Sequence, residues 1–183
     1  YFSLTQEIPL AYRWTLDGMV NYTEAHPGSS LTSQEIVSNS RSYAGGITYH
    51  AMISREQNLA LRMGIESRDV RSKLLGTVPL ANDSVRALRG NLNFQRMDSW
   101  LGMTFVSANI SQGLTGLGAS REGAANLSRA QAVPDFTKFD AAITRFQALP
   151  YDMTLQLSAS GQKSNDPLFS SEEYGFGGQS FGR

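Results

Sequence analysis

The feature that most constrains this chain is an alternation of apolar and polar residues with a period of two. It is clearest at residues 153–162, where Met153, Leu155 and Leu157 fall on one parity and polar residues fall on the other. A two-residue period is the spacing of a β-strand whose two faces meet different surroundings. The alternation recurs in residues 14–23, 47–53, 58–66, 88–95 and 138–144.

Two further segments complete the strand pattern. Leu101, Met103 and Phe105 open one strand as its apolar positions, and residues 2–8 supply another at the start of the chain. The pattern therefore predicts about eight strands and no helix.

The connections between these strands alternate in length. Short turns are predicted near 9–13, 54–57, 97–99 and 148–151, and long polar connections near 24–35, 69–82, 113–134 and from 164 onward. Short turns at one end and long loops at the other are typical of an antiparallel up-and-down transmembrane β-barrel, whereas a soluble β-sandwich mixes the two. The glycine-rich segment 115–134 is expected to be mobile or to fold over the barrel mouth.

Aromatic and basic residues agree with a barrel. Tyr12, Trp14, Trp100 and Tyr151 lie beside the short turns, as a membrane-interface girdle requires. A basic residue that faces lipid at mid-bilayer costs roughly 2–4 kcal/mol. Arg96 and Arg145 share the apolar parity, but each lies near a short turn, from which its side chain can reach the interface. The residues predicted to face the lumen are Arg62, Arg89, Asn91, Asn93, Gln95, Lys138, Asp140, Gln156 and Gln162.

Composition excludes several classes of protein. The 183 residues include 16 basic and 16 acidic ones and no cysteine. A balanced charge argues against a nucleic-acid partner, and the lack of cysteine excludes disulfides and thiolate metal sites. His26 and His50 make no metal motif, no GxxxxGK[ST] nucleotide motif is present, and no run of about 18 apolar residues is found. We therefore expect neither an enzyme nor a bound cofactor or metal, and we expect the chain to be a fragment.

The C-terminal residues carry a family pattern. Residues 157–162 read LSASGQ, residues 170–173 read SSEE, and Gly177-Gly178 precede Phe181-Gly182-Arg183. This order over residues 136–183 resembles the two-partner secretion transporters, or TpsB proteins, of the FhaC/ShlB/HecB type, including HxuB-like members. Arg183 takes the position of that family's loop arginine, while Gly182 replaces its commoner valine.

The resemblance implies a fragment of about eight strands from a 16-stranded outer-membrane barrel that follows POTRA domains. Residues 1–183 are then a partial transmembrane barrel, and residues 164–183 begin an extracellular loop that folds into the lumen. In the family, the loop arginine meets an acidic residue of the inner wall, which we expect beyond residue 183. The implied loop-motif residues are Ser170, Ser171, Glu172, Tyr174, Gly177, Gly178, Phe181, Gly182 and Arg183.

The resemblance also implies a function in the bacterial outer membrane, which is type V secretion. The transporter would move a large unfolded TpsA-like exoprotein, such as an adhesin, a haemolysin or a haem-acquisition protein. Its other partner would be outer-membrane lipid. A diffusion channel, a nutrient receptor barrel and a soluble β-sandwich binding module stay open as alternatives. Glu172 and Glu173 either keep the loop soluble or anchor it.

Overall fold

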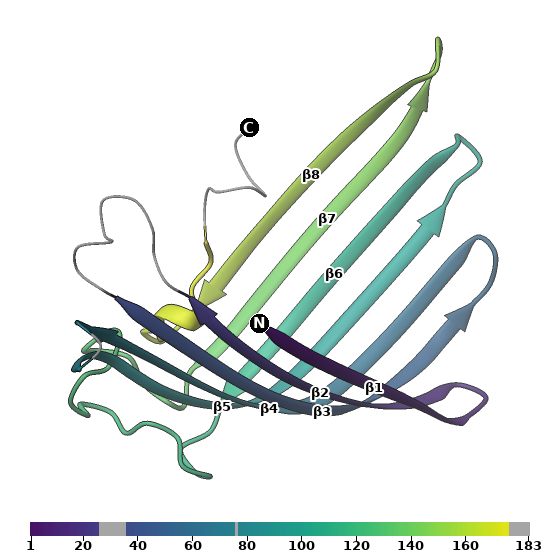
Figure 1. Cartoon of the computed structure of the whole chain (residues 1–183). Coiled ribbons are helices and arrows are strands. Elements are labelled where there is room, and N and C mark those ends of the chain that lie inside the picture. The colour runs from purple at the N-terminus through teal and green to yellow at the C-terminus, as the bar shows by residue number, and fades with distance from the viewer. Residues whose placement is uncertain (26–35, 76, 176–183) are drawn as a thin grey trace.

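A single antiparallel sheet makes up almost the whole structure (Figure 1). The computed structural model describes residues 1–25, 36–75 and 77–175. The eight strands follow one another in chain order across the sheet, which confirms the expected all-β up-and-down topology. They are β1 (Phe2–Ala11), β2 (Trp14–Ala25), β3 (Val37–Ile53), β4 (Gln57–Leu74), β5 (Val78–Met97), β6 (Gly102–Gly113), β7 (Thr137–Leu149) and β8 (Met153–Ser164).

Helical structure in the described residues consists of one short 3-10 turn, η2 (Ser170–Glu172). Among those residues, no helix has the length and apolar character needed to cross a membrane.

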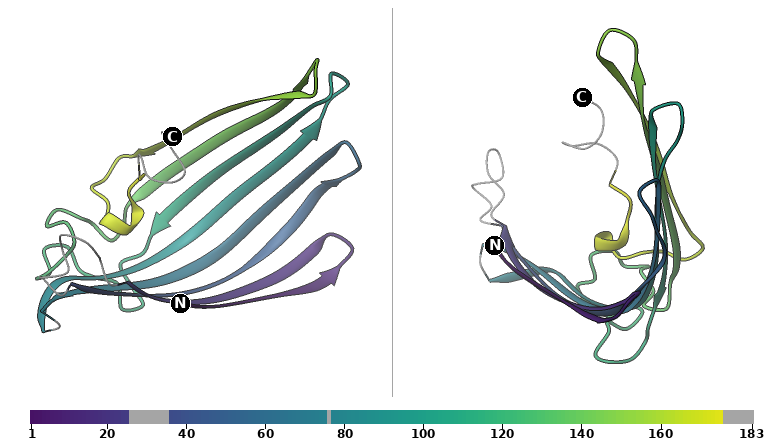
Figure 2. Two further views of the ribbon diagram at one scale, coloured as in Figure 1. Left: turned by 45° about the horizontal axis from the view of Figure 1, so that its top comes forward. Right: turned by 90° about the vertical axis from the view of Figure 1, so that its right-hand side faces the viewer.

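The sheet is strongly curved, and η2 lies on its concave side (Figure 2). Strand pairing places one row of polar residues across this face, with Arg62 opposite Asn91, Asn91 opposite Asn109, and Asn109 opposite Asp140. Residues of the opposite parity face the convex side, because successive side chains of a strand alternate between its faces. A row of polar side chains therefore crosses the middle of the concave surface.

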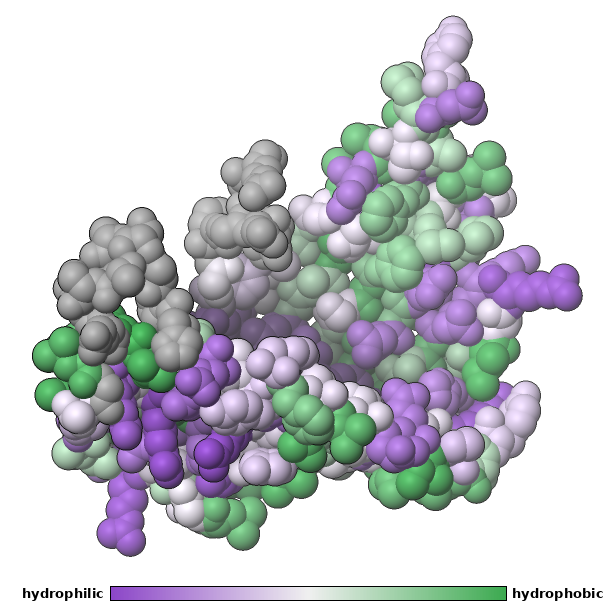
Figure 3. Space-filling view, in the orientation of Figure 1, coloured by the Kyte–Doolittle hydropathy of each residue, from purple (hydrophilic) through white to green (hydrophobic). Residues whose placement is uncertain are grey.

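The convex face carries an exposed apolar band. Met63 retains 70% of its side-chain surface and Leu157 retains 57%, and Trp14 packs against Tyr49 with ring centroids 4.7 Å apart. In the space-filling view, hydrophobic residues run along the lower, convex edge of the sheet, and hydrophilic residues line the hollow (Figure 3). A sheet with an apolar outside and a polar inside is arranged for lipid on the outside and water on the inside.

The expected long connection at 69–82 is wrong. β4 continues to Leu74 and β5 begins at Val78, so a tight hairpin joins strands of 18 and 20 residues. The alternation stops there because charged residues occupy both parities of these extensions, as Arg68 and Asp69 do in β4. The backbones of β4 and β5 stay paired beyond the residues that alternate, so the apolar–polar alternation ends before the strands end.

The expected orientation of β6 is also wrong. Phe105 pairs with Gln95 and Met103 pairs with Met97, so both lie on the concave parity. Leu101 belongs to the preceding turn, with a φ of 58°. The large side chains in the first half of β6 therefore mark the inner face, and smaller residues such as Val106 and Ala108 take the outer one.

The long segment 114–136 folds back onto the end of β5 rather than extending away from it. β6 ends at Gly113 opposite Ala87, which leaves the rest of β5 without a strand on that side. Residues of the segment cover this edge, because Leu114 N donates to Arg86 O at 2.8 Å and Ser120 N donates to Ser84 O at 2.8 Å. Pairing an otherwise open strand edge satisfies its backbone groups.

The buried hydrophobic core of the described residues lies where this segment meets the C-terminal one. Its largest members, Phe136 and Phe169, are both fully buried. Residues from three places build it, namely β5, the segment before β7, and the residues after β8: Val85, Ala87, Leu127, Ala132, Phe136, Leu168 and Phe169. This core fixes the C-terminal segment 165–175 against the concave face and positions the site described next.

Candidate functional site

A polar hollow of about 520 Å³ occupies the middle of the concave face. Strands β1 to β7 contribute to its lining, and charged side chains of both signs face each other across it. Arg62 is held by Asp17, since its Nε lies 2.9 Å from Asp17 Oδ1 and its Nη2 lies 2.5 Å from Asp17 Oδ2. A two-pronged contact of this kind fixes the guanidinium geometry as well as its charge.

Glu172 is the centre of the site. Its carboxylate is 1% exposed, although the residue belongs to a segment that follows the last strand. Arg89 donates to both of its oxygens, from Nη1 at 2.9 Å and from Nη2 at 2.6 Å, and Lys138 Nζ donates at 2.8 Å. One loop carboxylate thus joins two strands of the concave wall, β5 and β7.

Further charges extend this contact into a network that we call the anchor cluster, composed of Glu66, Arg68, Arg89, Lys138, Asp140 and Glu172. Glu66 accepts from Arg68 at 2.5 Å and from Arg89 at 3.0 Å, and Asp140 lies 3.6 Å from Lys138 Nζ. Arg68 also lies 3.8 Å from Glu172. Three cations face three carboxylates, so the cluster is neutral only when Glu172 is docked.

The electrostatics of Glu172 agree with strong docking. Burial alone would raise the pKa of its carboxyl, but the hydrogen bonds and charges of Arg89 and Lys138 outweigh burial and lower the pKa to about 2. A carboxyl with a lowered pKa contributes stability above its usual value of 4.5 and loses that contribution as the pH falls through about 2. At neutral pH the carboxyl is fully ionised and the contact is complete.

Backbone and neighbouring contacts hold the same segment. The carbonyl oxygen of Glu172 accepts from Gln162 Nε2 at 2.9 Å, and Arg68 donates to the carbonyl of Ser171 at 3.3 Å. Tyr174 bonds to Ser160 through its hydroxyl, and Arg129 pairs with Glu173. The segment is therefore attached to the wall on both sides of Glu172.

The structure brings together only part of the residues expected to face the lumen. Arg89, Lys138, Asp140 and Gln162 meet at the anchor cluster or beside it. Arg62 lies further along the same face, where it also reaches Asn91 at 3.4 Å. Asn93 and Gln95 lie nearer the short turns, and Gln156 on β8 contacts Ser158 at 3.4 Å.

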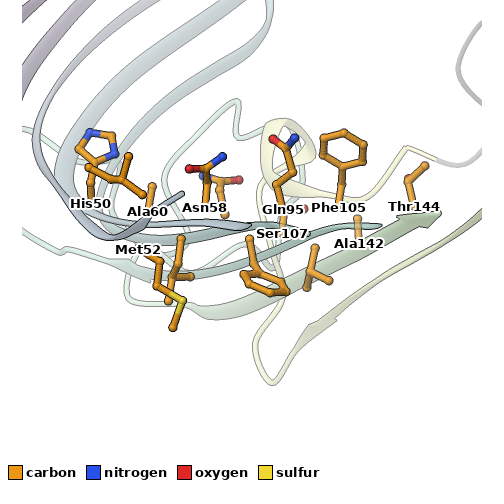
Figure 4. Close-up of a pocket in the computed structure, with 14 residues that line it drawn as sticks. His50, Met52, Asn58, Ala60, Gln95, Phe105, Ser107, Ala142 and Thr144 are labelled. Carbon is orange, nitrogen blue, oxygen red and sulfur yellow. The ribbon is translucent and has the colours of Figure 1, made fainter. Parts of the chain in front are cut away.

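A second hollow, of about 530 Å³, includes those residues near the short turns. His50, Asn58, Gln95 and Phe105 project to one side of the sheet, while Met52 projects to the other (Figure 4). Among the described residues, no hydrogen bond joins the His50 side chain to a serine.

The remaining predicted residues lie at the margins. Tyr12, Trp100 and Tyr151 are all at least 78% exposed at the short-turn end, and Trp14 lies beside them at the start of β2. Gly177, Gly178, Phe181, Gly182 and Arg183 lie outside the described residues. Of the described loop residues, Ser170 N donates to the Ser128 hydroxyl at 3.1 Å, and the buried hydroxyl of Ser171 has no partner among the described groups.

Arg145 shows how a cation on the convex parity is accommodated. Its Nη1 lies 2.8 Å from Asp98 Oδ2 in the turn between β5 and β6, and this hydrogen bond lowers the pKa of the Asp98 carboxyl. Arg145 therefore reaches a carboxylate at the short-turn end.

Sequence reasoning missed the partners Asp17 and Glu66 as site residues. Both share the polar parity of their strands, which is a visible signal, but their pairing with Arg62 and Arg89 spans 45 and 23 residues of chain. Strand register decides those pairings, and a single alternating pattern does not specify register between strands.

Comparison with known proteins agrees with the fold. The family model for haemolysin secretion/activation protein ShlB/FhaC/HecB matches residues 2–181. Among solved structures, CdiB from Escherichia coli aligns with a TM-score of 0.74 at 16% identity, over 99% of this chain and 34% of CdiB. The chain thus spans about a third of that protein, and no curated protein sequence matches it.

The structural likeness shows that the curved sheet is part of an outer-membrane β-barrel fold. The family match covers nearly the whole chain and ends at Phe181, two residues before Arg183. The chain belongs to the ShlB/FhaC/HecB family, the two-partner secretion transporters of the Gram-negative outer membrane.

Proposed function

We propose that this chain forms about half of a pore wall through which an unfolded exoprotein crosses the outer membrane in two-partner secretion. Residues 1–183 would be the partial barrel, with the long connections at the cell surface. Residues 164–175 would begin the extracellular loop that folds into the lumen. The observation that carries the proposal is the buried contact of Glu172 with Arg89 and Lys138, which holds this segment against the concave wall.

The chemistry of the wall suits an extended polypeptide. Most charges of the described wall are paired within it, as in Arg62 with Asp17, and Glu7 is a lining carboxylate without an ion pair among the described residues. Amide and hydroxyl side chains such as Asn91, Asn109 and Ser111 offer hydrogen bonds to a backbone that has left water. Transport in this scheme needs no reaction at the wall, and binding or folding of the exoprotein outside supplies the driving force.

The docked segment determines how wide the pore is. With Glu172 in place, residues 165–175 occupy the concave side at the long-connection end. We propose that Arg183 acts as the loop arginine further along the same segment and pairs with an acidic residue of the remaining barrel. Glu172 would then be a first anchor and Arg183 a second.

The test is secretion by the full-length transporter together with its exoprotein. Cells that carry the wild-type transporter release the exoprotein into the medium, and deletion of the transporter abolishes release. An Arg183→Ala variant that reaches the outer membrane as a folded barrel is expected to lose most secretion. If wild-type cells release no exoprotein but pass small solutes, the protein is a diffusion channel or receptor, and the proposal is wrong.

A further inference from the structure

Basic side chains gather on the convex face beyond the apolar band. On β4 the convex parity runs through Leu61, Met63 and Ile65 and then continues into Asp69, Arg71 and Lys73. On β3, Arg41 lies opposite Asp69. On β5, Ser84 lies opposite Asp69, and Arg86 follows Ser84 by two residues on the same face. The change from apolar to charged residues therefore occurs at one level across β3, β4 and β5.

The basic residues of this surface differ in whether their side chains contact other residues. Arg86 is paired with Asp69 at 3.0 Å, and Arg41 lies over the ring of Tyr22 with 5.6 Å to its centroid. Arg71 and Lys73 are exposed, and neither forms a hydrogen bond or ion pair with any residue that the structure describes. Two cations thus remain available to an outside ligand, beside two that are already oriented.

The height of these residues matches the headgroup layer. Each strand residue rises about 3.3 Å, and barrel strands tilt by about 40°. Arg71 follows Leu59, the first leucine on the convex parity of β4, by twelve residues, so it lies about 30 Å further along the membrane normal, and Lys73 lies beyond it. An apolar band of a barrel is about 25 Å tall, which places both cations outside the hydrocarbon layer.

We propose that Arg71 and Lys73, supported by Arg41, bind the phosphate groups of lipopolysaccharide, the phosphorylated glycolipid of the outer leaflet. The inference rests on the proposed function, because that function places the long-connection end at the cell surface. A guanidinium contacts two phosphate oxygens at once, and the Lys73 ammonium adds a mobile point charge. Four cations on this surface face the carboxylates of Glu24 and Asp69, so its charge is complementary to a polyanion.

The experiment uses the full-length transporter in nanodiscs and purified lipid A–core lipopolysaccharide as the probe. Each basic residue near an anionic lipid surface is worth roughly a fivefold change in affinity. The Arg71→Gln/Lys73→Gln variant is therefore expected to bind the glycolipid about 30-fold more weakly. The matched control is Arg55→Gln/Arg96→Gln, which removes two exposed cations at the opposite end of the sheet.

Two further readouts make the outcome decisive. Enzymatically dephosphorylated glycolipid should bind to the wild-type protein as weakly as intact glycolipid binds to the double variant. Equal affinities for the two glycolipids, or an equal loss in the control variant, would overturn the proposal. Secretion of the exoprotein reports separately on the proposed function, because a wild-type transporter that secretes normally but binds intact and dephosphorylated glycolipid equally well contradicts lipopolysaccharide binding alone.

Discussion

Replacing Glu172 by Gln tests the anchor most directly. The variant keeps the shape of the side chain and removes one charge from a carboxylate that is 1% exposed. The anchor cluster then holds three cations against the two carboxylates Glu66 and Asp140, so one positive charge is buried without a partner. Losing one member of a buried ion pair is strongly destabilising, because the other member keeps its desolvation cost.

The size of the effect follows from the pKa of Glu172. The fall from 4.5 to about 2 corresponds to about 3 kcal/mol of preference for the ionised, docked carboxyl. The variant should therefore raise the undocked population of residues 165–174 by about two orders of magnitude. The contacts of Gln162 with the carbonyl of Glu172 and of Arg129 with Glu173 remain. The backbone pairing of the strands does not involve Glu172, so the barrel strands should stay folded.

Hydrogen–deuterium exchange of the full-length transporter in nanodiscs measures this population. Amides of residues 168–174 should exchange about a hundredfold faster in the Glu172→Gln variant, while amides of β5 and β7 keep their protection. The control is Glu173→Gln, whose partner Arg129 is 44% exposed, and it should change exchange by less than about fivefold. Equal exchange in the wild type and in the Glu172 variant would refute the argument that this carboxylate holds the segment.

Three other predictions follow from single contacts. Docking of residues 165–174 should be constant from pH 8 down to about 4.5 and should weaken only as the pH falls towards 2, which exchange at stepped pH checks. Gly113→Ala would place a Cβ 2.0 Å from the Pro134 carbonyl oxygen, so we expect a loss of about 1–3 kcal/mol and faster tryptic cleavage at Arg121. Arg62→Gln leaves Asp17 unpaired and should cost about 1–3 kcal/mol, seen as a lower unfolding temperature of the barrel.

Much of the sheet could be predicted because the membrane imposes a simple rule on each strand. Where one face meets lipid and the other meets water, alternation reports the face directly, as for Leu155 and Gln156 in β8. The rule applies only to the part of a strand that has lipid on one face and water on the other. The ends of β4 and β5 around Arg71 lie beyond the level of the hydrocarbon layer in our proposal, and their residues show no alternation although they pair as strands.

The error at β6 has a related cause. The alternation rule turns large apolar residues towards lipid, yet Phe105 lies inside, where it packs edge-on against Phe146 at 6.0 Å between ring centroids. An inner wall also contains places where apolar side chains cover one another. The pairing of Phe105 with Gln95 shows which face of the sheet Phe105 lies on.

Glu172 shows most clearly what a sequence leaves undecided. A pair of glutamates in a loop is compatible with solvation or with anchoring. Here one of the two neighbours is exposed and the other anchors the segment. Glu173 is 45% exposed and pairs with Arg129 at the surface, whereas Glu172 is buried against Arg89 and Lys138. Without Glu172, the strand residues of the anchor cluster hold three cations against two carboxylates. The carboxylate that balances this cluster comes from the loop segment, so docking of the loop contributes to the stability of the cluster.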